Sequence, residues 1–349
     1  MFIHITNFRK KLLGVLLVTI ILVTIIILKS TYFNESQIII GAFIHSEKES
    51  KYEDDLYEFN SNKSYELDER FQRPSKLSSV KLKYNFRRPK DKGEVPPYVA
   101  EGFPTIYQTP EDVIHGYYAI LKSAANMMGY EGGCGTIAWM DSPYPYAYRL
   151  LSDDIKDNIT LEEFKDSFKG TGAMNLLHLE PAYEPTNTPD SIKYYFTEVE
   201  ALKGHPYKKG ETYGTQPNYF EYYYGIVTTE YNKKDGWKIK SVDYLPEIYL
   251  CHPFHGWNYD YDSIIGVIYN NWYGMDLKID NTDIENNYIQ VYASNQDNEY
   301  KFDFIRLTNG DDVLLHEYIK ENDKWKEVSI LRPDDEKYYK VSILKFNNE

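Results

Sequence analysis

The sequence contains only two cysteines, Cys134 and Cys251, among 349 residues, which excludes a disulfide-dense secreted domain. Its 20 glycines are too few for a collagen, and it shows no heptad repeat that would indicate a coiled coil. It also lacks G-x-S-x-G, H-E-x-x-H and P-loop sequences, which mark hydrolases, zinc proteases and nucleotide-binding proteins. We therefore predict no catalytic residue from a motif and no cofactor.

Positive charge is scarce as well. Lys and Arg total 39 against 53 Asp and Glu, which gives a formal net charge of −14. The first thirty residues hold four bases and no acid, so the rest of the chain is more acidic still. Nucleic-acid binding needs a basic face, and we exclude it. The 42% hydrophobic and 16% aromatic content indicates a folded chain rather than a disordered one.

The longest apolar run covers residues 12–28, LLGVLLVTIILVTIIIL, and contains no charged residue. Lys11 and Lys29 flank it. This length is at the short end of the range for a transmembrane helix, and a run that is apolar on every face is unlike a core helix. We predict that residues 1–29 form a cytoplasmic tip and a transmembrane anchor in contact with membrane lipid.

The residues around the run favour an uncleaved anchor, with a cleaved signal peptide as the alternative. No small-x-small cleavage pattern follows the run, and the next cysteine is Cys134, which excludes a lipoprotein signal. Arg9, Lys10 and Lys11 precede the run, and an acidic segment follows it. The positive-inside rule then places the N-terminus in the cytoplasm and residues 30–349 outside the cell membrane.

Residues 30–104 are expected to form a charge-segregated stalk or linker. Residues 47–69 contain nine acids and three lysines, whereas residues 70–92 contain nine bases and a single acid. A solvated linker is the simplest interpretation. The alternatives are a basic strip that touches anionic lipid headgroups or envelope polymers, and pairing of the two blocks with each other.

A folded domain is expected over residues 105–255. It opens with TPED at 109–112, where a capping threonine, a proline at the first helical position and two acids predict the start of a helix. Apolar residues recur at helical spacing through 113–128, before a glycine that can end the helix. A second short helix is expected over 146–151, and a capping box predicts a third over 160–168.

After residue 170 the apolar period changes to two, which is typical of strands. Candidate strands are Met174–Tyr183, Ile192–Leu202, Tyr219–Tyr231 and Trp237–Leu245. The last two are separated by NKKDG, which is typical of a hairpin loop. Three helices followed by about four long antiparallel strands predict an α+β domain with its helices on one face of a curved sheet.

Three stretches carry a resemblance: PEDVIHGYYAIL at 110–121, YAYRLLSDDIKDNITLEEFKDSF at 146–168 and GIVTTEYNKKDGWKIKSVDYL at 225–245. Residues 105–250 resemble the NTF2-like, or cystatin-like, cone superfamily. The resemblance implies a first helix packed in a concave sheet, and a closing strand of the form D-G-W-K-I. The superfamily includes enzymes, binding modules and membrane-anchored secretion or conjugation components, so the resemblance implies no single function.

Residues 256–349 repeat the order of a helix followed by strands, and we expect a second α+β domain, mostly antiparallel β-structure, or an extension of the first sheet. The helix is expected from Asp262 to Gly274. Strands are expected at Tyr288–Ala293, Tyr300–Leu307, Val313–Ile319, Trp325–Leu331 and Tyr338–Phe346.

The cysteines lie outside the membrane in this topology, where a disulfide between Cys134 and Cys251 is allowed. Two unpaired thiols are the alternative. The sequence CHPFH at 251–255 gathers three potential ligands for a soft metal, but its spacing matches no standard zinc pattern. An inter-domain turn is the simpler interpretation, and we predict no metal site.

Tyrosine is unusually frequent, at 35 of 349 residues, and its densest cluster falls on the expected strands of the first domain. Tyr194, Phe220, Tyr222 and Tyr224 are candidates for a pocket lining or a recognition surface, because aromatic side chains offer large, rigid contact areas. Cross-strand packing is the alternative. In a cone fold one face of these strands lines the concavity, and the sequence does not choose between the two faces.

Enzymes on the cone fold move protons with a carboxylate, a histidine and a tyrosine inside the concavity. Asp141, His178 and several tyrosines are eligible, which is too many to single out a site. We expect a membrane-anchored extracytoplasmic binding or scaffolding protein of the cell envelope, with another envelope protein as a partner. The alternative is an envelope enzyme or a small-ligand-binding protein that uses the aromatic concavity.

Overall fold

The computed structural model describes residues 77–87, 98–132, 138–185, 187–206, 219–247 and 259–331. Within these ranges, no helix combines the length and the apolar character needed to cross a bilayer. The anchor predicted at residues 12–28 and the strand predicted at Tyr338–Phe346 lie outside the described residues.

The first half begins with helices α3 (Pro110–Leu121), α4 (Tyr144–Tyr148), α5 (Asp153–Asn158) and α6 (Leu161–Asp166). Thr109 caps α3 by accepting a hydrogen bond from the backbone N–H of Asp112 at 3.2 Å. Thr160 and Glu163 form the complete capping box that starts α6. Both predicted helix starts are therefore confirmed, although α3 ends at Leu121 rather than near Met128.

An antiparallel sheet follows, with strand order β1–β2–β3–β4. Its strands are β1 (Thr171–Pro181), β2 (Ile192–Lys203), β3 (Tyr219–Asn232) and β4 (Gly236–Pro246). Each matches a predicted strand to within a few residues. The register pairs Phe196 with Ile226 across β2 and β3, and Gly225 with Tyr244 across β3 and β4.

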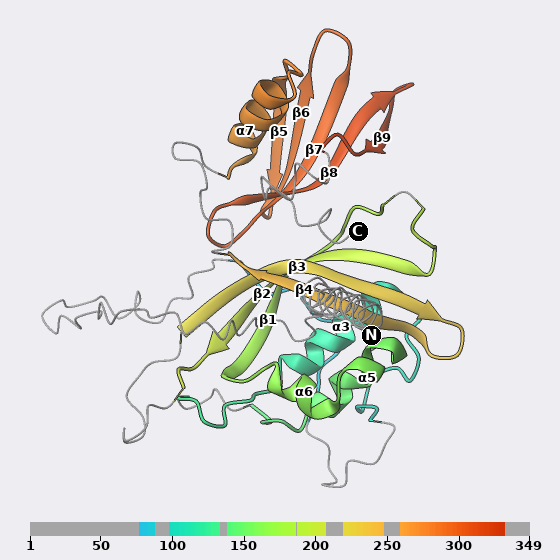
Figure 1. The fold of residues 1–349 in the computed structure, drawn as a ribbon, viewed down its shortest axis with the longest axis vertical. Coiled ribbons are helices and arrows are strands. Elements are labelled where there is room, and N and C mark those ends of the chain that lie inside the picture. Colours follow the sequence, from blue (N-terminus) through green and yellow to red (C-terminus); the bar gives the residue numbers. More distant parts are fainter. Residues whose placement is uncertain are drawn as a thin grey trace, which may run out of the picture. The chain divides into compact units, whose positions relative to one another are not determined.

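Helices α3, α5 and α6 lie on one face of this sheet, which curves over α3 (Figure 1). Side chains alternate between the two faces along each strand. The odd-numbered residues of β2 and β3 pack into the helix-covered core: Tyr195, Val199, Ala201, Tyr223 and Val227. The even-numbered residues Tyr194, Phe196, Tyr224 and Ile226 belong to, or pack against, a second buried cluster.

Residues 77–87 and 98–104 differ from the expectation of a stalk over 30–104. Phe86 and Ala100 are buried in the first core, and Val80 donates its N–H to the carbonyl of Leu176 at 2.8 Å. Apolar residues alternate here with exposed polar ones: Val80, Leu82, Tyr84 and Phe86 against Lys81, Lys83, Asn85 and Arg87. This period of two is typical of an amphipathic extended segment. The prediction of a stalk considered only the number of basic residues and missed this pattern.

The second half opens with a short helix, α7 (Tyr261–Ile264), which continues into the π-helix η2 (Ile265–Trp272). Asp260 caps α7 by accepting from the N–H of Ser263 at 2.7 Å, two residues before the expected start at Asp262. The described residues then form an antiparallel sheet in the order β5–β6–β7–β8–β9. Its strands are β5 (Lys278–Glu285), β6 (Tyr288–Ser294), β7 (Glu299–Arg306), β8 (Asp312–Glu321) and β9 (Lys324–Val328).

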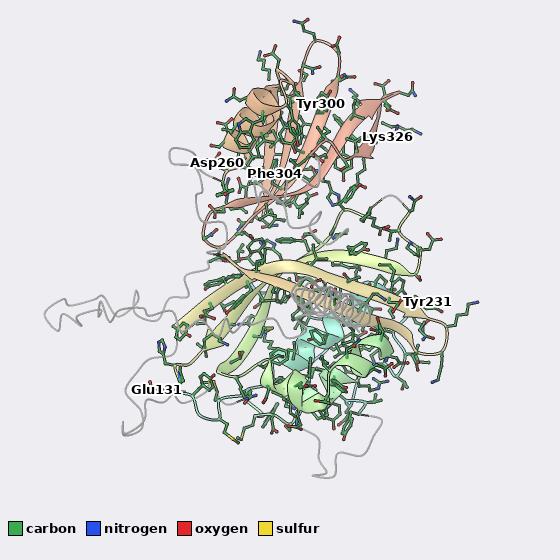
Figure 2. The ribbon with its side chains drawn as sticks, viewed as in Figure 1. Glu131, Tyr231, Asp260, Tyr300, Phe304 and Lys326 are labelled. Carbon is green, nitrogen blue, oxygen red and sulfur yellow. The ribbon has the colours of Figure 1, made fainter. Side chains whose placement is uncertain are left out.

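The second core is largely aliphatic and aromatic. Ile264, Ile265, Ile268 and Tyr269 of the helical segment pack in one cluster with residues of the second sheet. Tyr300 and Phe304 of β7 belong to this cluster and lie in its crowded interior (Figure 2). The α+β fold class with antiparallel sheets is therefore confirmed for the described residues.

Candidate functional site

The predicted recognition aromatics share one face of the first sheet. Tyr194, Phe220, Tyr222 and Tyr224 are even-numbered residues of two paired strands, so they face away from α3. Tyr224 is fully buried and lies with its ring centroid 6.4 Å from that of Phe196. Tyr222 donates its hydroxyl to Glu200 at 2.9 Å. Their role in recognition stays a prediction.

The concave, helix-covered face is filled by the protein's own side chains. Tyr117 and Tyr118 of α3 are 1% exposed, and Tyr223 and Tyr244 of the sheet are nearly as buried. The hydroxyls of Tyr118 and Tyr244 are hydrogen-bonded to each other, and Thr197 Oγ1 lies 2.9 Å from the Tyr244 hydroxyl. Burial raises the pKa of both tyrosines, so this chain of hydroxyls is neutral.

The other residues singled out by sequence lie elsewhere. Asp141 lies on the loop before α4, with an exposed carboxylate 3.6 Å from Lys165 Nζ, and so it is not part of the concavity. Cys134, Cys251 and the CHPFH segment lie outside the described residues. Within the described residues, no group of three or more His, Cys, Asp or Glu side chains is arranged to hold a metal ion.

A buried acid–histidine cluster, consisting of His178, Glu198 and Glu247, lies at the even face of the first sheet. His178 comes from β1, Glu198 from β2, and Glu247 directly follows β4. Their exposed fractions are 7%, 0% and 5%. His178 Nε2 lies 3.5 Å from Glu198 Oε2, and the Glu198 side chain is a close neighbour of Glu247.

The two glutamates of the cluster bind the turn between β7 and β8. Glu198 Oε1 accepts from the backbone N–H of Thr308 at 3.0 Å and from its hydroxyl at 2.7 Å. Glu247 Oε2 accepts from the N–H of Asn309 at 3.0 Å. Because turn N–H groups need partners when they leave water, these carboxylates complete the bonding of the turn.

Burial sets the protonation of the cluster. Burial, together with the neighbouring Glu198 side chain, raises the pKa of Glu247 to about 9. Burial lowers the pKa of His178, against the opposing pull of Glu198, so the imidazole is neutral at neutral pH. At neutral pH the cluster therefore pairs a protonated Glu247 with a neutral His178.

A cavity of about 720 Å³ lies beside this cluster. Its wall is formed by β1, the turn between β5 and β6, the turn between β7 and β8, and the start of the described chain. The polar lining residues are Ser78, His178, Glu180, Asn286, Asn287, Arg306 and Thr308. A volume of this size is within the range of small-molecule sites.

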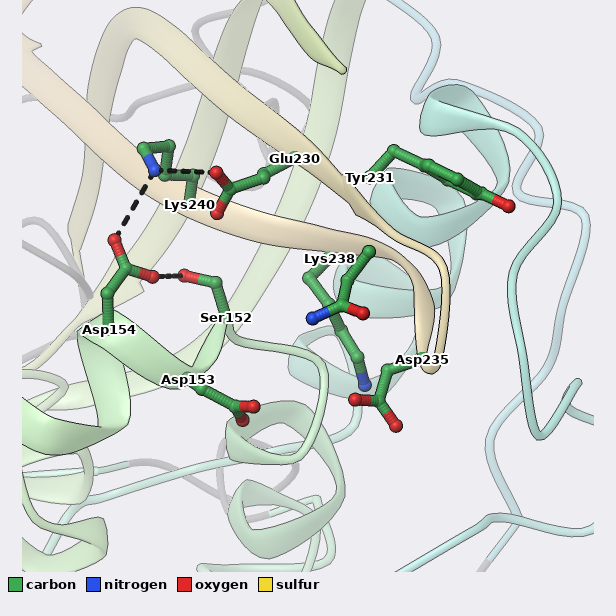
Figure 3. Close-up of a pocket in the computed structure, with 9 residues that line it drawn as sticks. Ser152, Asp153, Asp154, Glu230, Tyr231, Asp235, Lys238 and Lys240 are labelled. Atoms are coloured by element: carbon green, nitrogen blue, oxygen red, sulfur yellow. Dashed lines mark hydrogen bonds and ion pairs between the residues drawn. The ribbon is translucent and has the colours of Figure 1, made fainter.

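A second polar groove, of about 460 Å³, lies where α5 meets the tip of the β3–β4 hairpin (Figure 3). Lys240 Nζ lies between Glu230 Oε1 at 3.0 Å and Asp154 Oδ2 at 3.4 Å. Burial alone would lower the pKa of Lys240, but the two carboxylates outweigh the effect of burial, and the pKa is raised. Figure 3 shows Lys238 and Asp235 on the hairpin side of the groove and Tyr231 turned away from it.

Lys238 and Lys240 have pKa values that are shifted in opposite directions. Burial, reinforced by the charges of Arg149 and Lys156, lowers the pKa of Lys238 to about 8. We expect acylation of Lys238 by an amine-reactive ester to reach half its maximal rate near pH 8. Lys240 is the matched control and should reach it only above its ordinary pKa of 10.5. Peptide mass spectrometry across pH 6–11 measures both, and parallel profiles would contradict the difference.

Comparison with known proteins gives only a weak structural likeness. Neither a protein-family model nor a curated protein matches the sequence. Among solved structures, the chain is similar to an "Ntf2 like protein involved in plasmid conjugation", at 10% identity and a TM-score of 0.17. The alignment covers 57% of this chain and 88% of that one. At this TM-score, the likeness supports no conclusion about the fold or the function.

Proposed function

We propose that this chain is a membrane-anchored extracytoplasmic binding or scaffolding protein of the cell envelope, with an NTF2-like first domain. The observation that supports a binding role over an enzymatic one is the packed concavity. Tyr117, Tyr118, Tyr223 and Tyr244 occupy the space in which an enzyme of the cone type would hold its substrate. Side chains buried in this way leave no room for a substrate among them.

The surface of the folded part supports the same proposal. Several large apolar side chains are exposed on the two sheets and their loops, among them Ile284 at 55% and Trp325 at 37%. Single exposed apolar residues are ordinary, but tryptophan is enriched in the energetically important centres of protein interfaces. The anchor predicted at residues 12–28 would hold these surfaces close to other envelope proteins.

Site-specific photo-crosslinking in intact cells tests this proposal. A photoreactive residue at Trp325 or Ile284 of the full chain should crosslink to an envelope protein that mass spectrometry identifies. The same residue at Tyr118, which is buried, serves as the matched control and should give no intermolecular crosslink. Crosslinks to cytoplasmic proteins, or equal crosslinking from the buried position, would refute the proposal.

A further inference from the structure

The cavity beside the acid–histidine cluster has an unusual balance of charge. Its wall and the layer behind it contain the carboxyls of Glu180, Glu198, Glu247 and Asp312, against the guanidinium of Arg306. Burial raises the pKa of Glu247 and lowers the pKa of His178, so both are neutral at neutral pH. Among the described residues, neither Glu180 nor Glu198 forms an ion pair with a Lys or Arg side chain, so these carboxyls lack a paired cation.

Arg306 does not supply the missing positive charge. Its Nε donates to Asp312 Oδ1 at 2.8 Å and its Nη2 donates to Asp312 Oδ2 at 2.9 Å. This bidentate pair compensates the charge of the guanidinium within the protein and holds it in a fixed orientation. A second basic group near the wall, His316, already lies 2.6 Å from Glu327 through Nδ1 and 3.1 Å from the carbonyl of Pro181 through Nε2.

The cavity wall offers acceptors more than donors. Glu180 contributes a carboxyl whose pKa is raised by burial, with His316 opposing the shift. Asn287 uses its Nδ2 to bond the carbonyl of Arg306 at 3.2 Å, which leaves its amide oxygen as an acceptor. Ser78 and Thr308 add hydroxyls to the lining. A donor-rich ligand fits this chemistry, whereas a carboxylate or a phosphate does not.

Unsatisfied buried atoms lie directly behind the wall. His178 Nε2, Glu198 Oε2 and Glu247 Oε1 are buried and make no hydrogen bond with the described residues. Unpaired buried polar atoms are costly, so their concentration beside a cavity indicates a polar occupant that improves the local electrostatics. No described group of ligands is arranged for a metal ion, which favours an organic cation.

We propose that this cavity binds a small organic cation with a primary ammonium group, held by Glu180 and the acceptors of the two neighbouring turns. His178 forms the neutral inner wall, and the Glu198–Glu247 pair supplies negative charge from behind it. A bound ammonium stabilises the ionised form of the nearby carboxyls, so binding is expected to release a proton. The affinity should therefore rise with pH through neutrality.

Isothermal titration of the full chain in detergent with putrescine, a short diamine, tests this proposal. The expected result is saturable binding, with an apparent heat that differs between phosphate and HEPES buffers, neither of which contains a primary ammonium, because a proton is released. Succinate, a diacid of similar length, should not bind. Absence of putrescine binding at millimolar concentrations would overturn the proposal.

Two variants that remove the same charge distinguish binding at the cavity from general attraction to an acidic chain. Glu180→Gln should weaken putrescine binding at least about tenfold, since it removes the charge-assisted contact. Glu184→Gln is the matched control, because Glu184 lies outside the cavity lining and pairs with Lys193 at 2.9 Å. Equal weakening by both variants would show non-specific attraction and refute the site. Thermal unfolding confirms that both variants fold.

Discussion

The free energy of unfolding of the full chain should fall by several kcal/mol as the pH rises from about 5 to about 9, because one pKa unit corresponds to about 1.4 kcal/mol. Glu247 is the main cause. Its pKa is about 9 in the folded protein, against an ordinary value of 4.5. Urea titrations in non-ionic detergent, followed by tryptophan fluorescence at a series of pH values, measure this decline.

The direction of the change follows from the proton balance. A raised pKa means that the folded chain binds this proton more tightly than the unfolded chain does. The stabilisation is complete below pH 4.5, where both states are protonated, and it is lost as the pH rises through about 9. When Glu247 ionises, two buried carboxylates face each other at the turn that holds Thr308 and Asn309.

Glu247→Gln is the matched variant. Glutamine keeps an acceptor for the N–H of Asn309 and cannot ionise. The variant should lose most of the pH dependence and be more stable than the natural chain at pH 9. If the natural chain and the variant showed the same pH profile, the assignment of the pH dependence to Glu247 would be wrong.

Truncation of Tyr118 to alanine should destabilise the chain by about 3–5 kcal/mol, which is the usual cost of removing a buried aromatic side chain. Tyr118 is 1% exposed beneath the first sheet, and its hydroxyl bonds that of Tyr244. Tyr118→Phe should cost about 1–3 kcal/mol, since it removes only the hydroxyl and leaves Tyr244 with the bond to Thr197. Urea titration at pH 7 measures both changes.

The control for this prediction is Tyr231→Ala. Tyr231 is 42% exposed at the end of β3, where its ring lies 5.5 Å from that of Trp237. Its truncation should cost about 1 kcal/mol or less. If Tyr118→Ala cost no more than Tyr231→Ala, the concavity would be a tolerant, hollow pocket. The argument for a binding role over an enzymatic one would then lose its support.

Most helices and strands of residues 105–247 were predicted because they have local causes, but α5 (Asp153–Asn158) was missed, since its N-cap Ser152 makes no side-chain cap hydrogen bond. The capping threonines at 109 and 160 fix the helix starts, and apolar alternation with hairpin signals fixes the four strands. Strand β5 was missed because its residues, KIDNTDIE, are mostly polar and exposed, so only pairing with β6 makes it a strand. The π-helix η2 has no signature that distinguishes it from an α-helix.

Only one residue of the acid–histidine cluster, His178, was named from the sequence. Glu198 and Glu200 alternate with apolar residues on β2, a pattern that predicts a solvent-facing side, whereas the structure buries both. Glu247 carries no such signal, since it follows β4 and becomes important only through Asn309, 62 positions later. Contacts between segments so distant depend on tertiary folding and cannot be predicted from local patterns.

The central proposal, an anchored protein with its folded part outside the cell membrane, is tested most directly by protease treatment of intact cells. An affinity tag at each end of the full chain reports the two sides. We expect added protease to remove the tag after Glu349 and to leave the tag before Met1 intact until the cells are lysed. Survival of the C-terminal tag on intact cells, with digestion after lysis, would contradict the proposal.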